Sequence, residues 1–229
     1  MVSTLAVAAI FLDSSRLKVG TNWAGEQIIH YHNEAQEIDE THRFKLSFRV
    51  TASEAKMWVV ARTSELLSTK IGDTELGPPP KVRPETFKEY LSPAGFLLLV
   101  DPADRGLFNL DRMLHFWMPE NRPPAWKVDM TTTEEGQPSI KGLAEFKQIG
   151  DPGSYSREYR LKYSTGEGTG DLSAIARMRF DDKTGRLLQA WIQAKNCVMQ
   201  GGTLKADVSM AYADATMPKP SLEGFSEGW

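Results

Sequence analysis

The chain has very little cysteine, no excess of basic charge and no long apolar run. Its single cysteine, Cys197, excludes an intramolecular disulfide. Lys and Arg number 27 against 30 Asp and Glu, and they are scattered among the acids, so we expect no nucleic-acid partner. No stretch is long enough for a membrane-spanning helix, so we expect no integral membrane span.

The first twelve residues are the most apolar part of the chain. Residues 2–12 are rich in small side chains and about as long as the core of a secretion signal. Ala6, Val7 and Ala8 resemble a small-x-small cleavage site, although no basic residue precedes the apolar core. Residues 1–12 are therefore either the remnant of a signal or the first buried element of the fold.

Alternation of apolar and polar side chains dominates the rest of the chain. Between residues 155 and 213 it predicts four consecutive β-strands; in one of them Ala174, Ala176, Met178 and Phe180 alternate with more polar neighbours. Residues 44–50 alternate in the same way. A period of two indicates strands with one face packed against the apolar interior of the protein and the other face in contact with water.

We predict a single, mainly β domain over residues 1–229. An N-terminal segment (1–23) precedes a first β-meander (24–66), a mixed middle with Pro-rich loops (67–139), a second meander (140–213) and a tail (214–229) that we expect to be extended or frayed. The predicted sheet is antiparallel and strongly curved, or a half-barrel, with one or two helices over one face, at 84–90 and 106–118. Two packed sheets are the alternative.

A pair of histidines is the best candidate for chemistry. His30 and His32 lie two apart in a predicted strand over residues 26–38, so both side chains leave the same face, where they suit one metal ion. Gly25, His30, His32 and Glu37 resemble the first metal motif of the cupin family, which implies Glu37 as a third ligand. The second cupin motif, with its further histidine, has no counterpart. The alternative is a pair of strand histidines beside acids, ahead of a polar tip at residues 39–41.

Aromatic and methionine side chains gather in the middle of the chain and on the later strands. They either form an ordinary core or line a hydrophobic cleft between the sheet and the helical middle. The candidates for contact with a ligand are Trp58, Phe96, Phe108, Met113, Phe116, Trp117, Tyr159 and Met178.

The remaining polar signals are weak. Cys197 lies in an alternating strand with no histidine nearby in the sequence, which favours a buried apolar role. Residues 166–170 read as a hairpin loop, and residues 181–185 as an ordinary turn. We therefore expect no catalytic residue and no cofactor.

Short pieces of the chain resemble the LolA/LolB/RseB-like group of bacterial envelope proteins. They are residues 17–20, Met118-Pro119 followed by residues 126–128, and Phe180-Asp181 followed by residues 184–187. The resemblance implies a half-barrel closed by helices around an apolar cavity, and carriage or sensing of lipoproteins in the envelope.

These observations together predict a non-enzymatic binding or carrier protein for a lipid, another apolar ligand or a lipoprotein-like partner. We expect it to work outside the cytoplasm, in the periplasm or cell envelope, with a cytoplasmic location as the alternative. The competing functions are a cupin-like, metal-dependent enzyme using His30, His32 and Glu37, and a structural module for protein interaction.

Overall fold

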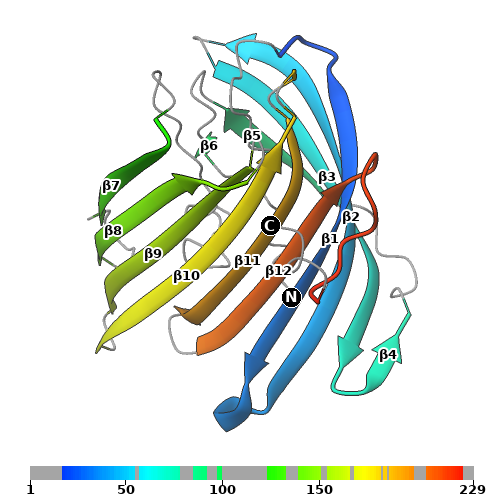
Figure 1. The fold of residues 1–229 in the computed structure, drawn as a ribbon. Helices are drawn as coiled ribbons and strands as arrows, with labels where there is room; N and C mark the ends of the chain where they lie inside the picture. The colour runs from blue at the N-terminus through cyan, green and yellow to red at the C-terminus, as the bar shows by residue number, and fades with distance from the viewer. Residues whose placement is uncertain are drawn as a thin grey trace.

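The structure of the protein is a computed structural model. It describes residues 17–54, 57–77, 85–91, 97–99, 123–132, 139–150, 154–165, 168–181, 183–184, 186–198 and 205–223. Apart from one short 3-10 turn, the regular structure in these ranges is β (Figure 1). No helix in these ranges has the length and apolarity that crossing a membrane requires.

All the described strands belong to one antiparallel sheet (Figure 1). In spatial order it runs β6-β5-β3-β2-β1-β12-β11-β10-β9-β8-β7, with β4 paired to β3. The strands are β1 (Asn22–Asn33), β2 (Ile38–Glu54), β3 (Met57–Ile71), β4 (Thr74–Leu76), β5 (Glu85–Leu91), β6 (Leu97–Leu99), β7 (Ala125–Thr132), β8 (Ser139–Gln148), β9 (Ser154–Thr165), β10 (Gly168–Phe180), β11 (Leu187–Val198) and β12 (Lys205–Asp214). The four strands expected over residues 155–213 are confirmed as β9 to β12.

The pairing of β1 with β12 joins the early and late strands into this single sheet. It runs from Gly25 opposite Asp214 to His32 opposite Asp207. The sheet does not close into a barrel, because β6 and β7 end the strand order without pairing to each other. The mainly β, antiparallel class is therefore confirmed, and within the described residues the two-sheet alternative is wrong.

One face of the sheet carries the core. Along β1, every second residue from Trp23 to Tyr31 is buried, while the residues between them are partly exposed. The buried side chains form one cluster that extends from Val60 on β3 to Trp126 on β7. We call this the inner face and the opposite one the outer face.

The helix expected over residues 84–90 is wrong. β5 (Glu85–Leu91) is a strand that pairs with β3, from Trp58 opposite Leu91 to Ser64 opposite Glu85. The backbone N–H and C=O groups on that side of β3 find their hydrogen-bond partners in β5. Such pairing between strands overrides the weak helix propensity of a short segment. The helix expected over residues 106–118 lies outside the described residues.

The polar tip expected at residues 39–41 is also wrong. The chain turns earlier, through a 3-10 helix at Glu34–Gln36. The Asn33 side chain accepts a hydrogen bond from the Gln36 backbone N–H at 3.1 Å, and Glu37 takes a left-handed conformation with φ of 53°. Residues 39–41 therefore belong to β2, and Asp39 lies directly opposite His32.

The start of the tail packs against the outer face instead of fraying. The Ala215 backbone N–H donates to the Ala24 carbonyl at 2.9 Å, and Pro220 is buried. Ala211 and Ala213, which are outer-face residues of β12, are both buried.

Candidate functional site

The inner face is apolar over a wide area. Two of the predicted ligand contacts lie there: Met178 on β10 is buried in the cluster, and Trp58 on β3 is partly buried against it. Tyr159 belongs to β9, but its side chain is not described, and Phe96, Phe108, Met113, Phe116 and Trp117 lie outside the described residues. Their role as ligand contacts stays a prediction.

A few buried polar side chains interrupt this apolar face, and the alternating pattern did not identify them as inner-face groups. Gln27 on β1 is fully buried; its amide nitrogen contacts Met210 Sδ at 2.7 Å, and its Oε1 has no hydrogen-bond partner. His42 on β2 contacts Thr69 Oγ1 at 3.1 Å and Glu40 Oε2 at 3.2 Å. Burial lowers the pKa of His42 below its usual value, and this outweighs the opposite effect of Glu40.

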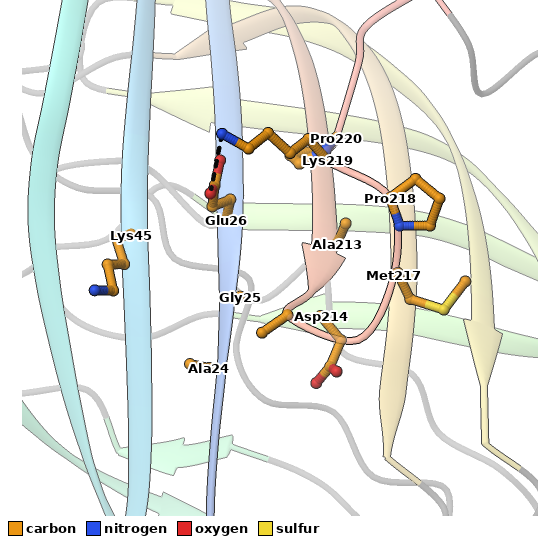
Figure 2. Close-up of a pocket in the computed structure, with 11 residues that line it drawn as sticks. Ala24, Gly25, Glu26, Lys45, Ala213, Asp214, Met217, Pro218, Lys219 and Pro220 are labelled. Atoms are coloured by element: carbon orange, nitrogen blue, oxygen red, sulfur yellow. Dashed lines mark ion pairs between the residues drawn. The ribbon is translucent and has the colours of Figure 1, made fainter.

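A pocket of about 320 Å³ lies on the outer face, where the tail crosses β1 and β12 (Figure 2). Glu26 and Lys219 line it and approach each other to 3.9 Å. At its end the Asp214 carboxylate accepts hydrogen bonds from Arg186 Nη2 at 3.2 Å and from the Thr216 hydroxyl at 2.6 Å. These contacts hold the turn that directs the tail back over the sheet.

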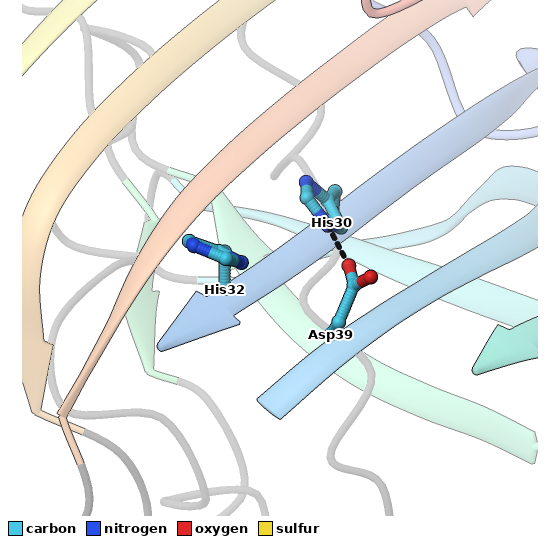
Figure 3. Close-up of side chains that lie close together, drawn as sticks. All are labelled: His30, His32 and Asp39. Carbon is cyan, nitrogen blue, oxygen red and sulfur yellow. Dashed lines mark hydrogen bonds and ion pairs between the residues drawn. The ribbon is translucent and has the colours of Figure 1, made fainter. Parts of the chain in front are cut away.

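His30 and His32 share one face of β1, as their spacing predicted, and it is the outer face. Figure 3 shows both rings and the Asp39 side chain projecting from the same side of β1 and β2. His30 Nε2 lies 2.7 Å from Asp39 Oδ1, and the two imidazole ring centres are 6.1 Å apart. The hydrogen bond with His30 holds the pKa of the Asp39 carboxyl below its usual value.

The third member of this cluster is Asp39, not Glu37. One possible ligand atom from each of His30, His32 and Asp39 lies within 4.8 Å of the other two. Glu37 is outside this group, because it ends the 3-10 turn. The signal that could have found Asp39 is the Asn33 cap, since a turn over residues 34–37 places Asp39 opposite His32.

The structure supports the reading of Cys197 as a buried apolar residue. The side chain is fully buried, and burial raises the pKa of the thiol far above its usual value. The turn after β10 is also confirmed, because Asp181 Oδ1 accepts hydrogen bonds from the backbone N–H groups of Lys183 and Thr184 at 2.7 and 3.2 Å.

Comparison with known proteins shows a likeness to a solved structure. No family model matches the chain, and no curated protein does. The chain is similar to a crystal structure from Vibrio parahaemolyticus that is provisionally described as an outer membrane lipoprotein-sorting protein domain. The match covers 88% of this chain and 86% of that one, with 7% sequence identity and a TM-score of 0.31. An overlap this loose supports no inference about the family or the function of this chain.

Proposed function

We propose that the protein is a non-enzymatic binding or carrier protein that holds a hydrophobic ligand against the inner face of its sheet. The observation that carries the proposal is the continuous buried apolar cluster on one face of a single sheet, from β3 to β7. The ligand class is an acyl chain or another flexible apolar group, including the lipid of a lipoprotein. The envelope is the location that suits such cargo.

The width of the sheet supports a half-barrel shape. Eight strand intervals separate β3 from β7 in the sheet order, which would span about 38 Å in a flat sheet at roughly 4.8 Å per interval. Within the described residues no second sheet or helix covers this face. Bending of the sheet around its inner face removes these apolar side chains from water. The same bend makes the inner face concave, and an apolar ligand can lie on a concave surface.

The chemistry of the inner face suits binding better than catalysis. The cluster consists of apolar side chains. Of the polar side chains buried on the same face, His42 contacts Thr69 and Glu40. The Gln27 amide nitrogen contacts Met210 Sδ, whereas its Oε1 has no hydrogen-bond partner. A ligand held there gains affinity because its own apolar surface leaves water, at roughly 25 cal/mol per Å² before the costs of association.

The competing enzyme hypothesis has less support. His30 and His32 lie on the outer face, where His32 and Asp39 are exposed, whereas a catalytic metal ion works in a dry, shaped cavity. The interaction-module hypothesis depends on an available strand edge, such as that of β7, and no specific contact favours it.

The proposal is tested by titrating the full chain with a phenylnaphthylamine probe, which fluoresces in apolar surroundings. We expect saturable binding that an added fatty acid displaces. Trp58→Ala should raise the Kd about 2- to 10-fold, because an aromatic contact contributes about 0.5–1.5 kcal/mol beyond its buried area.

The matched control is Leu76→Ala, which truncates an exposed apolar residue on β4. It should leave the Kd unchanged. Absence of saturable probe binding, or equal Kd values for the parent and Trp58→Ala, would contradict the proposal.

A further inference from the structure

We propose that His30, His32 and Asp39 form a binding site for a divalent transition-metal ion of the zinc type on the outer face of the sheet. The site lies on the opposite face from the proposed ligand-binding surface, so it is independent of that function. It differs from the cupin-like set in having Asp39 in place of Glu37.

Strand register brings the three ligands together. His30 and His32 are two residues apart on β1, so both side chains point to the outer face. Asp39 is the direct partner of His32 on β2, and directly opposed side chains on one face have Cβ atoms about 4.5–5.5 Å apart. Two neighbouring hydrogen-bonded strands therefore fix the backbone positions of all three residues.

The distances require only small side-chain movements. Zinc binds histidine nitrogen and carboxylate oxygen at about 2.0–2.2 Å, which puts tetrahedral ligand atoms roughly 3.3 Å apart. The three ligand atoms already lie within 4.8 Å of one another, and the His30–Asp39 pair is at 2.7 Å. Rotation about the side-chain bonds of these partly or fully exposed residues covers the difference.

The donor set selects the class of ion. Two imidazoles and one carboxylate suit Zn²⁺, Cu²⁺, Ni²⁺ or Co²⁺, whereas Ca²⁺ and Mg²⁺ prefer oxygen ligands alone. A second carboxylate, that of Asp207 on β12, lies opposite His32 on the other side and adds negative charge beside the site. Its Oδ1 accepts a hydrogen bond from the Asn196 backbone N–H, so it is already oriented by the protein.

Three protein ligands leave at least one coordination position open. His32 is exposed, and the Asp39 side chain is 56% exposed, so a water molecule or a ligand from outside the chain can reach that position. The ion would also link β1 to β2 beside the 3-10 turn between them.

The test is equilibrium dialysis or calorimetry of the chelator-treated full chain with Zn²⁺ alone. We expect one ion per chain. His30→Ala, His32→Ala and Asp39→Asn should each raise the Kd at least about 10-fold, because loss of even an outer-shell partner of a metal ligand costs about 10- to 100-fold.

Glu37→Gln is the matched control, because it removes an exposed carboxylate from the same turn without touching the proposed ligands. It should leave the Kd within about twofold of the parent, and circular dichroism should show all four variants folded. Absence of Zn²⁺ binding by the parent would overturn the proposal. So would binding that the two histidine variants do not weaken, or that Glu37→Gln weakens as much as Asp39→Asn does.

Discussion

Replacing Leu46 with alanine tests the assignment of the two faces of the sheet most simply. Leu46 is fully buried on β2, between Gly25 on β1 and Ser64 on β3. Truncation removes buried methyl groups and leaves a cavity, because backbone partners on both sides keep the strand in place. Such changes cost about 2–5 kcal/mol of the free energy of unfolding.

The matched control is Lys45→Ala. Lys45 is the preceding residue, and its exposed side chain points to the outer face. Surface substitutions of this kind change the free energy of unfolding by no more than about 0.5 kcal/mol. The pair of variants therefore compares the two faces at adjacent positions of one strand.

Urea denaturation followed by circular dichroism measures both variants. Leu46→Ala should lower the urea midpoint with an unchanged m-value, and should lower Tm by roughly 4–20 °C, since each 1 kcal/mol shifts Tm by about 2–4 °C in a chain of this size. The assignment of the faces would be refuted if Leu46→Ala and Lys45→Ala lowered the free energy of unfolding equally. It would also be refuted if Leu46→Ala lowered it by less than about 1 kcal/mol.

Two further predictions concern single positions. Gly25→Ala should destabilise the fold by about 3 kcal/mol in the same denaturation assay, because the added Cβ would meet the Ala213 carbonyl oxygen at 2.5 Å and the Tyr212 ring at 2.6 Å; a neutral effect would show that β1 and β12 do not approach this closely. His42 should make the protein less stable as pH falls below about 6.5, because its pKa is lowered by burial in the folded state and the unfolded chain then binds more protons. His42→Gln should make the free energy of unfolding depend less on pH between pH 7.5 and 5.5. An unchanged pH dependence would contradict the lowered pKa of His42 in the folded state.

The elements that the sequence predicted are those whose signal is local. The alternation around Met178 and that around Leu46 each follow from a period of two along one strand, and both residues are buried on the inner face. The shared face of His30 and His32 follows from the same period. Such patterns need no knowledge of what the strand pairs with.

The errors lie where distant or subtle contacts decide. Residues 85–91 became a strand because β3 offers them a pairing edge, which a short segment does not reveal in its own sequence. The polar run at residues 39–41 predicts a turn there, but the Asn33 cap and the left-handed Glu37 end the turn earlier, and neither feature shows in the alternating pattern. The pairing of β1 with β12 joins residues 175 to 189 positions apart in sequence, from His32 opposite Asp207 to Gly25 opposite Asp214, and no local pattern indicates it.

Native mass spectrometry of the full chain, purified without detergent and followed by organic extraction, tests the central claim most directly. A carrier with an apolar inner face should show a mass increment that organic solvent releases as a lipid or another apolar molecule. It should regain an increment when the stripped chain is incubated with fatty acid. A chain that shows only its own mass, both as purified and after that incubation, would contradict the proposed function.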